Sequence, residues 1–94
     1  MQTDRIDFEA ALARDGFPDI AERALAAGKS VPMHTHPFAV RAFVLDGEIT
    51  LTTGAGARTY RTGEVFVMAA GHEHAETVGP DGVRYVVGRA TVAG

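Results

Sequence analysis

The chain of 94 residues contains no cysteine, which excludes disulfides, thiolate metal ligands and cysteine nucleophiles together. It has no run of lysines or arginines, and its formal net charge is −3. We therefore expect no nucleic-acid partner, because such binding needs a concentrated basic face. No apolar stretch approaches the roughly 20 residues of a membrane span, and Asp7 and Glu9 stand where a signal peptide would be apolar. We expect a soluble, cytoplasmic protein that has no membrane partner.

The remaining composition is that of an ordinary small globular domain. Apolar residues make up 46% of the chain and charged residues 22%, which is typical of a folded protein rather than a disordered one. Eleven glycines and four prolines interrupt the sequence often, and this punctuation favours many short strands. A domain of this size buries a smaller fraction of its surface than a large one, so oligomerisation or a bound metal would add to its stability.

Residues 4–16 are predicted to form a short helix. Phe8 and Leu12 fall at helical spacing, Asp7 is suited to the start, and Gly16 is suited to the end. The apolar stripe is narrow, so we expect the helix to lie on the outside of something larger. We accordingly divide the chain into a helical extension at residues 1–19 and one barrel domain at residues 20–94.

The barrel domain is predicted to contain seven or eight short strands. Residues 20–27 would also tolerate a helix, but we favour a strand, since a helix would collide with the glycine-punctuated segments that follow. Asp46-Gly47 is a strong hairpin signal, and Gly79-Pro80-Asp81-Gly82 is predicted to be another turn. Such regular spacing indicates an antiparallel sandwich or barrel. The predicted strands are residues 20–27, 31–36, 40–45, 48–53, 58–61, 65–68, 72–78 and 83–89.

The four histidines form two pairs, and in each pair the members are one residue apart. In an extended strand His34 and His36 would point to the same face, where two imidazoles make half of a metal site. The second pair, His72 and His74, can supply a third ligand. A pair of hydrogen-bonded surface histidines beside a turn is the alternative for His34 and His36 taken alone.

Two motifs containing these histidines resemble those of the cupin superfamily. The first runs from Gly28 through five residues to His34-Thr35-His36 and on to Gly47, and the second runs from Gly63 through Ala69 and Gly71 to His74. The resemblance extends from about residue 20 to residue 89. It implies an all-β fold, an antiparallel jelly-roll (cupin) barrel preceded here by the short helix.

The resemblance also implies a divalent metal held by His34, His36 and His74. The chain departs from the motif at Val40, which stands where cupins usually have a glutamate ligand. Glu76 and His72 share strand parity with His74, so either can complete the ligand shell, and water is the alternative. Both also have simpler interpretations, Glu76 as an exposed strand carboxylate and His72 as a solvated loop residue. An imidazole-rich site suits zinc, nickel, copper or iron, and the sequence does not choose among them.

Apolar residues near the histidines are expected in the barrel core, and some of them line a pocket for a small organic molecule. We assign Phe38, Val40 and Met68 to this pocket. A metal-binding cupin is the leading hypothesis, and the resemblance points to oxygenase- or isomerase-type chemistry if the protein is an enzyme. The alternatives are a non-catalytic module that binds or senses a small ligand, and a degenerate cupin with a structural role. We expect a homodimer, to which the strand at residues 20–27 contributes.

Overall fold

The computed structural model describes residues 5–91. One helix, α1 (Arg5–Arg14), precedes six strands in this part of the chain. The strands are β1 (Asp19–Leu25), β2 (Ser30–His34), β3 (Phe38–Thr53), β4 (Gly56–Arg61), β5 (Val65–Met68) and β6 (His74–Thr91). Over residues 5–91, no helix has the length and apolar character needed to cross a bilayer.

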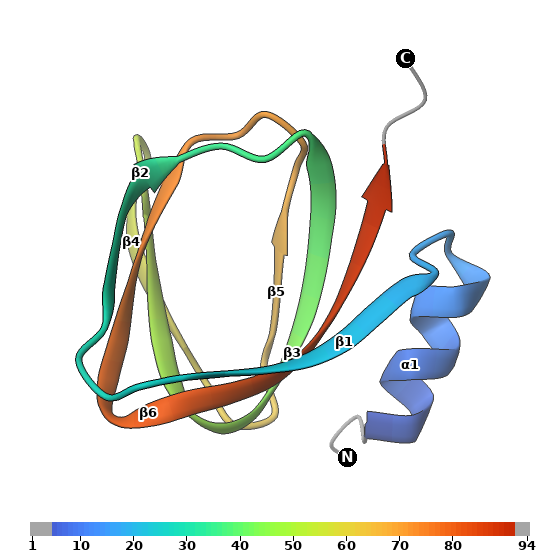
Figure 1. Ribbon diagram of the computed structural model, residues 1–94, viewed down its shortest axis with the longest axis horizontal. Coiled ribbons are helices and arrows are strands. Elements are labelled where there is room, and N and C mark those ends of the chain that lie inside the picture. The colour runs from blue at the N-terminus through green and yellow to red at the C-terminus, as the bar shows by residue number, and fades with distance from the viewer. Residues whose placement is uncertain (1–4, 92–94) are drawn as a thin grey trace.

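The six strands form one antiparallel sheet that curls into a jelly-roll barrel (Figure 1). Two long strands organise it, because each pairs with a different neighbour along each half of its length. β6 pairs with β2 near its start and with β1 near its end, while β3 pairs with β5 and then with β4. β3 and β6 also pair with each other along most of their length. The predicted all-β, antiparallel jelly-roll barrel with a short N-terminal helix is confirmed.

Two predicted turns are wrong, because β3 runs through Asp46-Gly47 and β6 runs through residues 79–82. The register between these strands shifts on both sides of Asp46 and Gly47, so the glycine makes an irregularity within a paired strand rather than a hairpin. Gly47 has a φ of +76° and Gly82 a φ of +78°. The left-handed conformation of each glycine bends its strand, and the two bends lie side by side, with Gly47 against the Gly82 carbonyl.

Most other predicted elements are confirmed, with shifts at their ends. Residues 20–27 contain a strand rather than a helix, and the strand at residues 65–68 has the predicted bounds. The strand expected at residues 72–78 begins at His74, and the one expected at 31–36 ends at His34. The helix predicted for residues 4–16 spans Arg5–Arg14, with Asp4 outside the described residues.

Apolar residues gather in two clusters, one on each side of the sheet. The larger cluster fills the barrel with side chains from the long strands, among them Val44, Ile49 and Phe66. The smaller one lies outside the barrel, where Phe8 and Leu12 of α1 pack against β3 and β6. Figure 1 shows the helix outside the ring of strands, beside β1.

The outer cluster predicts that the helix contributes to the stability of the barrel. Leu12 is fully buried, and its methyl groups lie against the backbone of Gly88. We expect Leu12→Ala to lower the free energy of unfolding by about 2–4 kcal/mol, because it leaves a cavity between helix and sheet. The measurement is urea denaturation followed by circular dichroism. Ile6→Ala on the same helix is the control, since Ile6 is 79% exposed and its loss should change little. Equal effects of the two substitutions would show that α1 does not pack as described.

Candidate metal centre

The pairing of β2 with β6 brings the first two histidines together. His34 at the end of β2 is the cross-strand partner of His74 at the start of β6, and such partners have neighbouring side chains. His36 follows in the loop before β3, where its carbonyl accepts a hydrogen bond of 2.8 Å from the Gly71 amide. The spacing predicted that His34 and His36 lie on one strand, but β2 ends at His34 and His36 lies in the loop. The loop nevertheless directs the His36 ring toward the rings of His34 and His74.

The three rings converge on one point. Their ligand atoms all lie within 4.8 Å of one another, and the Nε2 atoms of His34 and His36 are 3.1 Å apart. Two ligands of a tetrahedral zinc ion are separated by about 3.3–3.4 Å when the bonds are near 2.0–2.1 Å. The observed spacing is close to this, so the cluster has the dimensions of a transition-metal site.

Backbone carbonyls fix which nitrogen of two histidines is protonated. Nδ1 of His34 lies 2.8 Å from the Pro32 carbonyl oxygen, and Nδ1 of His74 lies 3.0 Å from that of His72. A carbonyl oxygen only accepts, so each Nδ1 carries the proton and each Nε2 presents a lone pair to the cluster. This is the tautomer that metal ligation through Nε2 requires.

His74 provides the clearest indication that the site suits a cation. Its side chain is 1% exposed, and Nε2 has no hydrogen-bond partner among the described residues. A buried acceptor without a hydrogen-bond donor costs free energy and requires an explanation. A metal ion coordinated by this lone pair satisfies it, so the residues present fit the group that the motif implies.

The Glu76 carboxylate of β6 lies beside the histidine cluster. Oε2 of Glu76 lies 3.5 Å from Nε2 of His34 and 3.5 Å from Nε2 of His74, and its side chain is 13% exposed. Val40, where a glutamate was expected, is buried on β3 and faces Met68 of β5. A carboxylate is therefore present next to the histidines on β6, whereas the position of the usual glutamate on β3 is apolar.

His72, the other candidate for the fourth position, is not brought into the cluster. Its side chain is exposed, and the group of converging ligand atoms consists of His34, His36 and His74. Its backbone carbonyl, however, orients His74. The parity of a regular strand does not apply to His72, because β6 begins only at His74.

The surroundings of His36 favour the form that binds metals. Burial lowers the pKa of His36, and the charges of His74, His34 and Arg89 lower it further. A lower pKa keeps the imidazole neutral near physiological pH, and neutral imidazole is the metal-binding form. The ring also stacks on Phe38, with centroids 4.8 Å apart and planes 6° from parallel, which fixes its orientation.

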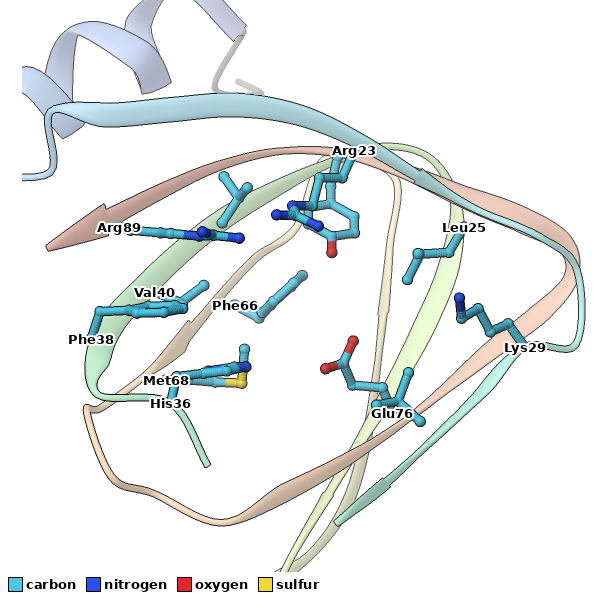
Figure 2. A pocket seen from close by; sticks show the side chains of 13 residues that line it. Arg23, Leu25, Lys29, His36, Phe38, Val40, Phe66, Met68, Glu76 and Arg89 are labelled. Carbon is cyan, nitrogen blue, oxygen red and sulfur yellow. The ribbon is translucent and has the colours of Figure 1, made fainter. Parts of the chain in front are cut away.

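A cavity of about 230 Å³ opens beside the cluster, and His36 and Glu76 form part of its wall (Figure 2). All three residues assigned to a pocket from the sequence, Phe38, Val40 and Met68, line it. Sequence reasoning missed three basic residues that also line it: Arg23, Lys29 and Arg89. Strand alternation is the signal that could have identified Arg23, because it shares parity with Leu25, which faces the same cavity.

Comparison with protein families gives a match to the model described as "Cupin domain" over residues 22–87. Among solved structures, the cupin domain of Schizosaccharomyces pombe Cnp3 superposes with a TM-score of 0.67 at 23% identity, covering 80% of this chain and 58% of that one. An RmlC-like cupin from Shewanella frigidimarina superposes with a TM-score of 0.67 at 15% identity, covering 78% of this chain and 65% of that one. The polyketide cyclase RemF from Streptomyces resistomycificus superposes with a TM-score of 0.64 at 23% identity, covering 74% of this chain and 52% of that one.

These structural likenesses concern the fold, since their identities are low. The chain spans about half to two thirds of the length of these three structures. The comparison with curated proteins gives no match.

Proposed function

The chain belongs to the cupin domain family, and on this premise we propose that it binds a divalent transition metal through His34, His36, His74 and Glu76. The observation that supports the proposal most strongly is the buried Nε2 of His74, which has no hydrogen-bond partner among residues 5–91. Three neutral imidazoles and one carboxylate suit zinc, nickel, copper or iron better than magnesium or calcium.

The proposed role of the adjacent cavity is to hold a small organic ligand beside the metal. A bound ion at the cluster would act as a Lewis acid toward an oxygen of that ligand. The chain's own contribution is positioning. The Pro32 and His72 carbonyls orient two imidazoles, and Phe38 and Met68 give the cavity an apolar wall next to His36.

The first use of such a site is metal-assisted oxygenase- or isomerase-type chemistry. One structural neighbour, RemF, is a polyketide cyclase, so this barrel architecture is compatible with catalysis. The second candidate is a non-catalytic module that binds or senses a small ligand. It is favoured by one observation: Glu76 is the only carboxylate among the residues that line the cavity. If Glu76 binds the metal, no other cavity carboxylate remains to act as a base.

A turnover assay distinguishes the enzyme from the non-catalytic binding module. The metal-loaded protein is incubated with a panel of small phenols, diketones and sugars, while oxygen consumption and product formation are recorded. Product formation that disappears in a His34→Ala/His74→Ala variant supports the enzyme. Saturable binding of a panel member without turnover supports the binding module.

Glu76 is predicted to act as a metal ligand, and this gives a direct test. Glu76→Gln removes the negative charge from the cluster and should lower the affinity for zinc by about 10–100-fold, measured by competition with a chromophoric chelator. Glu73→Gln is the matched control, because Glu73 is a nearby exposed carboxylate and should leave the affinity unchanged. A Glu76→Gln variant that binds zinc as tightly as the unaltered protein would remove Glu76 from the ligand set.

We also propose that the barrel forms a homodimer through β1. β1 lies at an end of the strand order, so one of its edges has no paired strand among the described residues, and most of its side chains are exposed. A free strand edge is a ready surface for pairing with a second copy. Sedimentation equilibrium at micromolar concentration is expected to give twice the mass of the chain. A monomer mass under these conditions would contradict the proposal.

A further inference from the structure

The cavity beside the histidine cluster is lined by basic residues that have no acidic partner among residues 5–91. Five of the nine lysines and arginines pair with a carboxylate: Arg5, Arg14, Arg41, Arg61 and Arg84. Of the other four, Arg23, Lys29 and Arg89 all line this one cavity. Cations that lack a carboxylate partner in the described part of the chain and line one cavity are suited to an anion from outside.

These cations reach the cavity from separate elements. Arg23 lies on β1, Lys29 in the turn that follows it, and Arg89 near the end of β6. The guanidinium of Arg89 lies over the ring of Phe38, 4.8 Å from its centroid. In Figure 2, Arg23 and Arg89 lie on the opposite side of the cavity from His36 and Glu76. Arg23 and Arg89 therefore face the histidine cluster across the cavity, while Lys29 lies apart from them, beside Leu25.

Between the cations and the cluster, the wall of the cavity is largely apolar. The volume of about 230 Å³ is below the roughly 300–1,000 Å³ of sites for drug-sized ligands, so the occupant is small. The apolar lining consists of Leu25, Val31, Phe38, Val40, Phe66, Met68 and Val87. Such a wall suits the hydrocarbon part of a ligand rather than a sugar or a polyphosphate.

One more polar group in the lining agrees with an anionic occupant. Tyr85 is 8% exposed, and burial, followed by the charge of Glu76, raises the pKa of its phenol. The phenol therefore stays protonated and keeps an O–H to donate. With Glu76 directed to the histidines, the remaining charged groups of the lining are all positive.

We propose that this cavity takes a small organic acid, whose carboxylate binds Arg23 and Arg89 and whose apolar body lies against Phe38 and Phe66. The inference deepens the proposed function and rests on it for the role of the cavity as a ligand site. It names the chemical class of the ligand, which neither the family nor the histidine cluster specifies. The apolar body then lies between the basic residues and the metal centre.

The test uses acids paired with neutral amides of the same shape: benzoate with benzamide, cyclohexanecarboxylate with its amide, and hexanoate with hexanamide. Affinities are measured by ligand-observed NMR and calorimetry on metal-free and zinc-loaded protein. At least one acid should bind about tenfold or more tightly than its amide, because charge-assisted hydrogen bonds are the stronger ones. If no acid in the panel binds more tightly than its amide, including the case in which none binds, the inference is wrong.

A matched pair of arginine substitutions locates the effect. Arg89→Gln, alone and combined with Arg23→Gln, should weaken binding of the preferred acid by about tenfold and leave the amide unaffected. Arg58→Gln is the control, since Arg58 is also unpaired among the described residues and also lies 4.8 Å from a ring centroid, that of Tyr60, but does not line this cavity. Equal effects of Arg89→Gln and Arg58→Gln would reveal only a general change of charge and overturn the proposal.

The outcome is distinguishable from failure of the metal proposal. If acid selectivity persists in His34→Ala/His74→Ala, the organic-acid site stands without a metal. If zinc binds at the cluster but acids and amides bind equally, the metal site stands and this inference alone is wrong. Circular dichroism of each variant establishes that the barrel is folded before the affinities are compared.

Discussion

The double substitution His34→Ala/His74→Ala is expected to abolish stoichiometric metal binding. It removes two of three converging imidazoles, including the buried one whose Nε2 has no hydrogen-bond partner in the described chain. We expect affinity for zinc and nickel to fall by more than about a hundredfold, since loss of even a group that only orients a ligand costs about 10–100-fold. The measurements are elemental analysis of protein purified without an affinity tag and the shift of melting temperature on adding metal.

His72→Ala is the matched control for this prediction. It also removes an imidazole next to the cluster, but the His72 side chain is exposed, and the carbonyl that orients His74 is retained. Metal content and thermal shift should therefore equal those of the unaltered protein. A double variant that is folded by circular dichroism and keeps its metal would contradict the assigned site, as would a His72→Ala variant that loses it.

Gly47→Ala is expected to destabilise the barrel severely. Gly47 has a φ of +76°, and an added Cβ would overlap the backbone carbonyl of Gly82. The left-handed conformation alone costs about 1–2 kcal/mol for an L-residue. Here the two long strands must also separate, so we expect a total loss of at least about 3 kcal/mol in the free energy of unfolding. Urea denaturation provides the measurement.

Gly28→Ala isolates the conformational part of that effect. Gly28 has a nearly identical φ of +72°, but an added Cβ would meet nothing within 4 Å. Its substitution should cost only the roughly 1–2 kcal/mol of the left-handed conformation. Equal destabilisation by Gly47→Ala and Gly28→Ala would show that β3 and β6 do not approach each other closely at Gly47 and Gly82.

Local sequence predicts the strands well but not how they connect. Asp46-Gly47 has the composition of a hairpin turn, and the residues on both sides of it are indeed extended. Whether the glycine reverses the chain or bends one strand depends on pairing with β6, more than 25 residues later in the chain. That contact is not encoded within the few residues around Gly47, so the two apparent turns could not be told from bends.

The same distinction applies to the site. The spacing of His34 and His36 predicted half of a metal site, the resemblance to cupins implied His74 as the third ligand, and strand parity with His74 made Glu76 a candidate fourth ligand. The choice between Glu76 and His72 required the start of β6, which the sequence placed two residues early. Alternation places Arg23 on the same face of β1 as Leu25, but which face lines the cavity depends on the register of β1 on β6, in which Arg23 pairs with Tyr85. Such a register arises from long-range packing and has no local signature.

The most direct test of the central claim is anomalous diffraction at the zinc absorption edge, from crystals grown with zinc. Our account predicts one strong peak at about 2.0–2.1 Å from the Nε2 atoms of His34, His36 and His74, with the Glu76 carboxylate as the fourth ligand. A peak located elsewhere, such as on His72, or a well-ordered cluster without a peak, would contradict the account.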